Sequence, residues 1–183
     1  LIAKKKYSFY FEVCISDNCS KANIKELIDK YSSSLNISFN KNYNNLGLGV
    51  NILKAVSLAK GEYVWILGND DLLLPNTFFY LEKLFKDNLT VDFFYINSFH
   101  LDSSLVLSGL QPFDTNDLPT KMKKFSSYPK SFQSDFFDLV NHNISFDFML
   151  GMFLIIFKKR IWDENLFRIN QNFIEDKRIY STF

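Results

Sequence analysis

The chain has 183 residues, of which 47% are hydrophobic and 17% aromatic, a composition suited to one well-filled core and far from that of a disordered protein. Its 21 Lys and Arg residues nearly balance its 20 Asp and Glu residues, so no overall basic field indicates nucleic-acid binding. The longest apolar run, residues 149–157, is too short for a membrane span, which needs about 20 residues. Cys14 and Cys19 have no second pair at zinc-site spacing, and we expect both to be free thiols.

The first half of the chain alternates predicted strands and helices. Short runs rich in β-branched and aromatic residues predict strands at residues 9–16, 37–39, 63–67 and 91–96. Helical spacing and flanking cap residues predict helices at 21–33, capped by Ser20, at 48–60, closed by Gly61, and at 75–86, begun by Pro75. Because such an order builds right-handed βαβ units, this half predicts an α/β fold with a mainly parallel sheet.

The pattern weakens after Asn97. We expect a short strand at residues 105–107, a helix at 131–141, a strand at 149–157 and a short basic helix at 158–162. No internal repeat or linker indicates a second domain, so residues 1–183 are expected to form one domain. Aromatic residues between Pro112 and Phe137 could form a platform for a ligand, although packing in the core or at an interface is favoured.

Carboxylates follow two of the predicted strands directly. Asp17 comes after the first strand, and Asp70 and Asp71 come after the third. Ligands of open α/β sheets bind at the carboxyl ends of the strands, and unpaired carboxylates near a core are costly. Hard divalent cations prefer a few carboxylate oxygens together with water and substrate phosphates. The acid pair therefore indicates either a metal site or a solvated, helix-capping turn.

Three segments break this tie: residues 12–20, 44–51 and 61–75 resemble the family-2 glycosyltransferases in order and spacing. The resemblance implies a GT-A fold, in which helices flank a Rossmann-like, mainly parallel sheet beside a smaller acceptor-side region. It implies a nucleotide-sugar-binding half at residues 1–97 and an acceptor-side, catalytic half at residues 98–183. The expected activity is a metal-dependent, inverting sugar transfer from a nucleotide sugar to a glycan or lipid-linked acceptor in surface polysaccharide biosynthesis.

The resemblance also implies where the nucleotide lies. Asp17 matches the aspartate that contacts the nucleoside. Three residues match the loop and helix that line the nucleotide pocket, where a glycine lets the backbone approach the ligand: Asn45, Gly47 and Asn51.

The acid pair matches the DxD-type motif of the family. Asp70 and Asp71 would hold Mn²⁺ or Mg²⁺ against the diphosphate, where the metal neutralises charge on the leaving group. The family often has an acid where this chain has Gly68, so contact with the ribose either falls to Asp70 or is missing.

The general base is expected near the end of the chain. Asp176 sits where many family members carry the aspartate that removes a proton from the acceptor hydroxyl. An exposed acid at a helix start explains the same residue equally well, and Asp163 and Asp147 are the runners-up. His100 and His142 have no partner motif, so a structural or surface position is favoured for both.

Two alternatives from other classes stay open. The first strand and helix of the fold normally precede the segment at Leu1, so the chain is expected to be truncated there, and possible truncation after Asp176 leaves room for a non-catalytic copy. Another nucleotide-binding α/β enzyme, such as a nucleotidyltransferase, is less favoured because residues 44–49 contain no Lys or Arg. We expect a cytoplasmic protein, with peripheral association at the inner face of the membrane as an open alternative.

Overall fold

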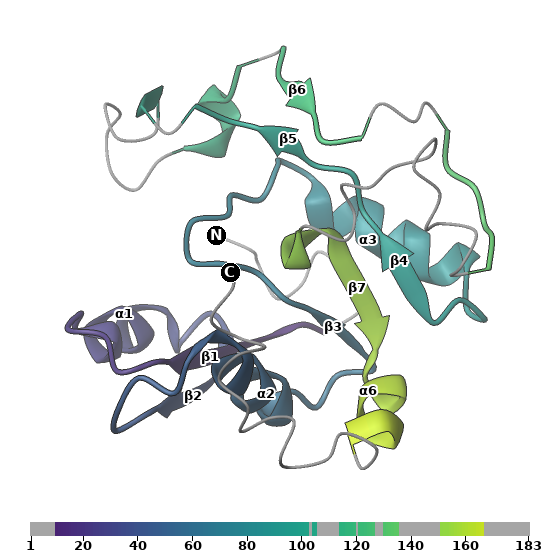
Figure 1. The fold of residues 1–183 in the computed structure, drawn as a ribbon. Helices are drawn as coiled ribbons and strands as arrows, with labels where there is room; N and C mark the ends of the chain where they lie inside the picture. Colours follow the sequence, from purple (N-terminus) through teal and green to yellow (C-terminus); the bar gives the residue numbers. More distant parts are fainter. Residues whose placement is uncertain are drawn as a thin grey trace. The chain divides into compact units, whose positions relative to one another are not determined.

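The computed structural model describes residues 10–102, 104–105, 114–119, 121–126, 130–135 and 151–166 (Figure 1). The chain divides into two compact units. Unit 1 contains Leu1–Val64, Glu82–Asp92 and Phe157–Phe183, and unit 2 contains Trp65–Leu81 and Phe93–Ile156. The expected organisation as one domain with functional halves meeting at residue 97 stays a prediction.

The first part of unit 1 is a parallel pair of strands with its helices (Figure 1). Strand β1 (Glu12–Asp17) pairs in parallel with β2 (Asn36–Lys41), and Asp17 lies opposite Lys41 at the end of the ladder. Helix α1 (Ile24–Tyr31) connects the two strands, and α2 (Leu48–Leu58) packs against both. The predicted strands and helices are therefore present, with both helices shorter than expected.

Two predicted helix caps are wrong, and hydrogen bonds explain both. The Ser20 amide donates to Asp17 Oδ1 at 2.8 Å, so a turn forms there and α1 begins only after its N-cap residue, Asn23. Helix α2 ends at Leu58, before the extended residue Ala59. The Gly61 amide instead donates to Glu12 Oε1 at 2.8 Å. In both cases a carboxylate of β1, Asp17 or Glu12, accepts the backbone amide of a residue that the sequence pattern had placed at a helix end.

A three-stranded sheet has the order β3-β7-β4, formed by β3 (Tyr63–Trp65), β7 (Ile155–Lys158) and β4 (Phe93–Tyr95). A short 3₁₀ turn, η3 (Met152–Leu154), precedes β7, so the strand begins later than predicted; residues 149 and 150 lie outside the described part. Leu154 and Ile156 are almost completely buried and belong to the core of unit 2. The predicted strand at 63–67 is shorter because Leu67, 41% exposed, lies beyond the sheet.

Helices follow two strands of this sheet along the chain: α3 comes after β3, and α6 comes after β7. Helix α3 (Thr77–Asp87) begins after Pro75 and after Asn76, whose positive φ of 63° turns the chain into the helix. Helix α6 (Lys159–Leu166) follows β7 directly, as the predicted basic helix requires, but is longer. Within unit 1, Asp92 lies 3.3 Å from Lys158 Nζ and 2.7 Å from Arg160 Nη2, which anchors the start of α6.

Unit 2 contains a hairpin-like pair of strands that the sequence did not predict. Strand β5 (Phe99–His100) pairs antiparallel with β6 (Lys123–Lys124), and a 3₁₀ turn, η1 (Thr115–Asp117), lies between them in sequence. The predicted strand at 105–107 is wrong at Leu105, which is helical, and the helix expected at 131–141 is absent from residues 131–135. Residues 106–107 and 136–141 lie outside the described part.

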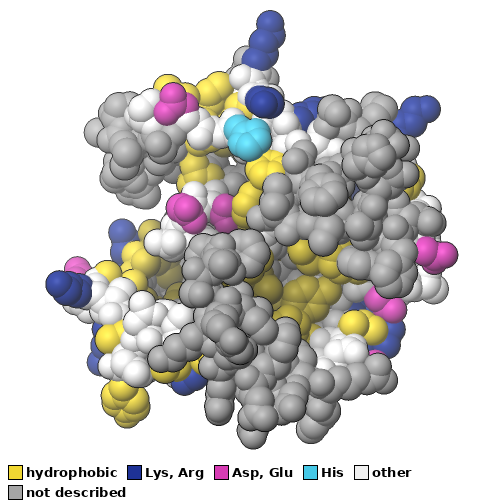
Figure 2. Space-filling view, in the orientation of Figure 1, with side chains coloured by type: hydrophobic (Ala, Val, Ile, Leu, Met, Phe, Trp, Pro, Cys, Tyr) yellow, Lys and Arg dark blue, Asp and Glu magenta, His cyan; other side chains and the backbone are white. Residues whose placement is uncertain are grey.

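Surface properties agree with the composition. Figure 2 shows the Lys and Arg side chains spread over the visible face rather than gathered in one patch. Within the residues that the structure describes, none of the helices is long and apolar enough to cross a membrane.

Candidate functional site

Asp17 ends β1 with a buried carboxylate. Its Oδ1 accepts the Ser20 amide at 2.8 Å, and its Oδ2 lies 3.3 Å from Lys41 Nζ. The hydrogen bonds from Ser20, helped by Lys41, hold the pKa of the Asp17 carboxyl below its ordinary value although burial opposes them. Oδ2 is buried and faces the Lys41 ammonium, so both oxygens of this carboxylate have a partner within unit 1.

An asparagine network, formed by Asn18, Asn40, Asn42, Asn45 and Asn51, joins the loops that follow β1 and β2 to the first turn of α2. Asn42 is its centre, because its Nδ2 donates to Asn18 Oδ1 at 3.2 Å and to Asn51 Oδ1 at 3.0 Å. Asn18 Nδ2 donates in turn to Asn45 Oδ1 at 2.7 Å. The network therefore fixes the shape of the loop at 42–47 from within.

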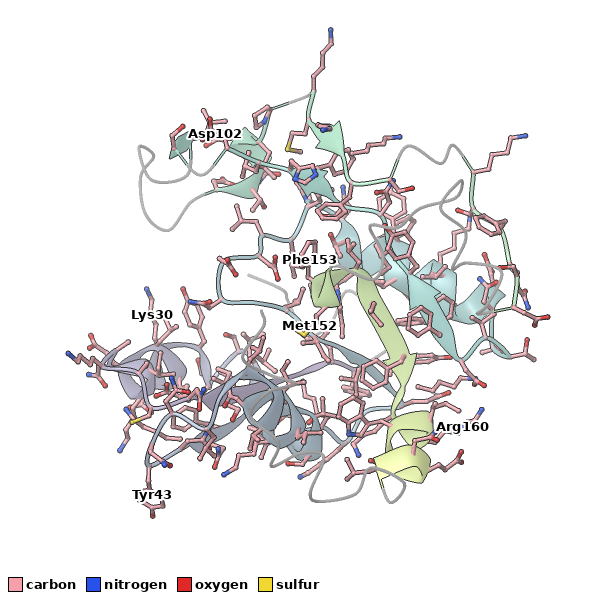
Figure 3. The ribbon with its side chains drawn as sticks, in the orientation of Figure 1. Lys30, Tyr43, Asp102, Met152, Phe153 and Arg160 are labelled. Carbon is pink, nitrogen blue, oxygen red and sulfur yellow. The ribbon has the colours of Figure 1, made fainter. Side chains whose placement is uncertain are left out.

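Gly47 and Asn51, two of the residues predicted to line the nucleotide pocket, have different structural roles in unit 1. Gly47 has a φ of 81°, the left-handed backbone that glycine adopts at no steric cost, and it forms the N-cap of α2. Asn51 Oδ1 accepts both Ser16 Oγ and Asn42 Nδ2, so its amide shapes the loop. Tyr43 projects outward from the same loop (Figure 3).

Sequence reasoning missed Asn18 and Asn42. Asn42 is only 3% exposed, and its backbone amide also donates to Asp17 O at 2.9 Å. The signal in the sequence was the density of asparagines between residues 40 and 51, which was assigned to turn formation alone.

The acid pair of unit 2 is held in one tight turn after β3. The Gly68 amide donates to Asp71 Oδ2 at 2.6 Å, and the Asp71 amide closes the turn on Gly68 O at 3.5 Å. A Cβ placed on Gly68 would lie 2.5 Å from Asp70 Oδ1 and 3.2 Å from Asp71 Oδ2. Both carboxylates therefore lie where a side chain at residue 68 would crowd them. A glycine at this position leaves the room that this arrangement of the acid pair needs.

The electrostatics of this turn suit a cation. Burial raises the pKa of the Asp71 carboxyl, the Gly68 amide opposes that rise, and the neighbouring Asp70 charge adds to it. No cluster of three or more His, Cys, Asp or Glu residues occurs within the described residues. Two carboxylates fit a cation such as Mg²⁺, which commonly binds one or two protein carboxylates and completes its shell with water and substrate phosphates.

A cavity of about 740 Å³ lies beside the acid pair in unit 2. Asp70 and Asp71 contribute to its lining, which is otherwise mostly apolar. Its size falls within the usual range of small-molecule sites, about 300–1,000 Å³.

Four aromatic lining residues that contact one another form an aromatic wall: Trp65, His100, Phe125 and Phe153. The His100 and Phe125 rings stack with centroids 4.5 Å apart, and Phe125 meets Phe153 edge to face at 5.7 Å. Trp65 Nε1 donates to Phe153 O at 2.7 Å, and Phe153 lies on the η3 turn (Figure 3). The wall is thus assembled from four separate segments, and His100, although exposed, stacks on Phe125 within it.

The remaining candidates fall into two groups. Asp176, Asp147 and His142 lie outside the described residues, so the general base stays a prediction. Asp163 lies on α6 and accepts both its hydrogen bonds from Lys159 Nζ, at 2.7 and 2.8 Å. Cys14 and Cys19 are free, as expected, and burial raises the pKa of the Cys14 thiol to about 11.

Comparison with known proteins gives a family match. The sequence profile described as glycosyl transferase family 2 matches residues 2–155. An abequosyltransferase of Salmonella typhimurium is 41% identical over 76 residues, which are 40% of this chain and 23% of that protein. An uncharacterized glycosyltransferase of Methanocaldococcus jannaschii is 34% identical over 96 residues, 50% of this chain and 32% of that protein. The matched regions therefore span a third or less of these relatives.

A solved structure is similar in fold. The crystal structure of TarS from S. aureus matches with a TM-score of 0.57 and 20% identity. The match covers 87% of this chain and 42% of the TarS chain.

Proposed function

Because the chain belongs to glycosyl transferase family 2 and has the expected GT-A α/β fold, we propose that it transfers a sugar from a nucleotide-sugar donor to an acceptor. The observation that carries the proposal is the Gly68 turn, which holds two carboxylates at the end of β3 beside a cavity of about 740 Å³. We further propose a glycan or lipid-linked acceptor and an inverting transfer in surface polysaccharide biosynthesis.

The residues of unit 1 would bind the nucleoside. Asp17, whose buried carboxylate is held in place by Ser20 and Lys41, would contact the nucleoside. The asparagine network would keep the loop at 42–47 in one shape, and Gly47 would allow the backbone to approach the ligand. Asn45 and Asn51 support the proposal as parts of that preformed loop.

The acid pair of unit 2 would hold Mn²⁺ or Mg²⁺. When bound, the metal would supply the positive charge that the leaving nucleoside diphosphate needs. Asp71, fixed by the Gly68 amide, would present its other oxygen, and the exposed Asp70 would complete the protein share of the shell and contact the ribose. Asp176 is proposed as the base that takes the proton of the acceptor hydroxyl.

Calorimetric titration tests this proposal. Wild-type protein is titrated with UDP, GDP and CDP, with and without Mn²⁺, and compared with Asp70→Ala/Asp71→Ala. We expect metal-dependent binding of at least one nucleotide that the double variant loses.

The matched control is Asp87→Ala, which removes an exposed carboxylate at the end of α3 and leaves the turn intact. Its binding should equal that of the wild type. A folded wild-type chain that binds none of the three nucleotides would sink the proposal.

A further inference from the structure

We propose that His100 binds the sugar of the nucleotide-sugar donor through a hydrogen bond of its imidazole ring. This role rests on the proposed function, since it needs a diphosphate at the acid pair. The sugar of a nucleotide sugar is bonded directly to the diphosphate. A diphosphate held at Asp70 and Asp71 therefore places its sugar at the unit 2 cavity, which the acid pair and His100 both line.

The polar side chains that line the cavity come mostly from two short segments. Apart from Trp65 and Thr77, they belong to residues 69–71, which follow β3, and to residues 97–100, which reach into β5. The first segment contains the two carboxylates that would hold the metal. The second segment therefore supplies most of the remaining partners for a sugar hydroxyl.

The three polar residues of the second segment differ in how far the protein uses them. Asn97 Oδ1 accepts the amides of Ser98 and Ser126, at 3.0 and 2.9 Å, and its Nδ2 donates one hydrogen to Ser126 O at 2.8 Å. The Ser98 hydroxyl can rotate to several directions. Neither ring nitrogen of His100, in contrast, makes a hydrogen bond to a residue that the structure describes.

Packing fixes the position of the His100 ring. The ring stacks on Phe125 with centroids 4.5 Å apart and planes 20° apart, and Phe125 in turn meets Phe153 edge to face. The backbone is fixed as well, because His100 pairs with Lys123 in the β5–β6 ladder. Hydrogen bonds of an imidazole lie in the plane of its ring, so stacking on one face leaves both nitrogens available. A ring already held in place loses little conformational entropy when it binds.

The imidazole suits a sugar hydroxyl in either of its neutral forms. One ring nitrogen donates and the other accepts, and a hydroxyl can take either part. The other rings of the aromatic wall add apolar surface for the C–H groups of the sugar. A histidine that belonged only to the outer surface would resemble Lys123, which is exposed on the paired strand and does not line the cavity.

Calorimetry in the presence of Mn²⁺ separates the sugar from the nucleotide. UDP is compared with UDP-glucose and UDP-N-acetylglucosamine, GDP with GDP-mannose, and CDP with CDP-glucose. The main variant, His100→Phe, keeps an aromatic ring that can stack on Phe125 but lacks both nitrogens. It should weaken binding of the nucleotide sugar by about 3- to 10-fold, the share of one hydrogen bond, and leave binding of the bare nucleotide within about twofold.

Two further variants complete the set. His100→Gln keeps a donor and an acceptor but no ring, so it should bind the nucleotide sugar more tightly than His100→Phe does. Lys123→Ala is the matched control, since it removes the exposed side chain paired with His100 and leaves the cavity lining unchanged. It should leave binding of the nucleotide and of its sugar unchanged.

The outcomes distinguish this role from the proposed function. If His100→Phe weakens the nucleotide and its sugar equally, or neither, the role of His100 is overturned and the proposed function stands. The same holds if the wild type binds a nucleotide but none of its sugars. Weaker sugar binding by His100→Gln than by His100→Phe overturns the assignment to the ring nitrogens. A folded wild type that binds no nucleotide and no nucleotide sugar overturns the proposed function and this role with it.

Discussion

The substitution Gly68→Ala should disturb the positions of the two carboxylates while leaving the free energy of unfolding almost unchanged. The added Cβ would meet Asp70 Oδ1 at 2.5 Å, where ordinary contact begins near 3.4 Å, so the carboxylate must move by about 1 Å. Asp70 is exposed and can give way by rotation, and Gly68 has no positive φ that alanine would resist. We therefore expect the free energy of unfolding to change by less than about 1 kcal/mol.

The metal site should respond more strongly. Forcing a side chain off its rotamer by about 30° costs roughly 0.5–1.5 kcal/mol, and the Cβ also crowds Asp71 Oδ2 at 3.2 Å. A loss of about 1.4 kcal/mol corresponds to about tenfold weaker Mn²⁺ binding. Mn²⁺ titration followed by electron paramagnetic resonance measures the affinity, and chemical denaturation measures the stability.

Gly61→Ala is the matched control, because its Cβ would lie 3.5 Å from Tyr63 O and 3.7 Å from Glu12 Oε1, at ordinary contact distance. It should leave Mn²⁺ binding unchanged. The reasoning is refuted if Gly68→Ala binds Mn²⁺ within twofold of the wild type, or if its affinity falls only together with its stability.

Three further predictions follow from charge and burial. Mn²⁺ binding requires deprotonated carboxylates, and the pKa of Asp71 is raised above the ordinary value of 3.8. The pH at which half of the Mn²⁺ affinity is lost should therefore be higher than for an ordinary carboxyl, and Asp70→Asn should lower that pH because it removes the neighbouring negative charge. Asp17, whose pKa is lowered, should contribute stability above pH 3.8 that is lost as the pH falls through its folded value, so denaturation at pH 7 and pH 3 should show Asp17→Asn costing more at pH 7. Asn42→Ala should destabilise unit 1 by about 2 kcal/mol in urea denaturation, whereas Asn45→Ala, at an exposed position, should cost less than about 1 kcal/mol.

Each of these three predictions would be contradicted by a specific result. A metal-binding midpoint that does not move in Asp70→Asn would remove the proposed influence of that charge on Asp71. Equal costs of Asp17→Asn at the two pH values would mean that its carboxylate gains nothing from Ser20 and Lys41. Equal costs of the two asparagine variants would mean that burial at residue 42 does not decide its importance.

The alternation of strands and helices up to β4 could be predicted because it follows from local periodicity. The boundaries could not, because distant acceptors decide them. The amide of Ser20 is held by Asp17, and that of Gly61 by Glu12, so the predicted caps serve as turns instead. Among the described residues, the glycine with left-handed backbone is Gly47, at the start of α2 rather than after its end.

The sites were predictable to different degrees. Asp17, Asp70 and Asp71 could be found as carboxylates that follow strands, because one local rule connects strand ends with ligands. The role of Asn42 could not, since a polar loop residue is normally exposed, and only the network makes its burial tolerable.

The strand pair in unit 2 and the aromatic wall were also missed. Lys123 and Lys124 form a strand too short and polar for any alternation to reveal. The residues of the wall come from segments far apart in sequence, and only the fold brings them together.

The central claim is that Asp70 and Asp71 hold a metal which the nucleoside diphosphate also binds. The most direct test is a binding cycle, in which Mn²⁺ affinity is measured with and without saturating nucleotide and nucleotide affinity with and without Mn²⁺. In the wild type each ligand should strengthen the other by the same factor, because coupling free energies are reciprocal. The coupling should vanish in Asp70→Ala/Asp71→Ala and persist in Asp87→Ala. Coupling that survives the double substitution, or is absent from the folded wild type, would contradict the account.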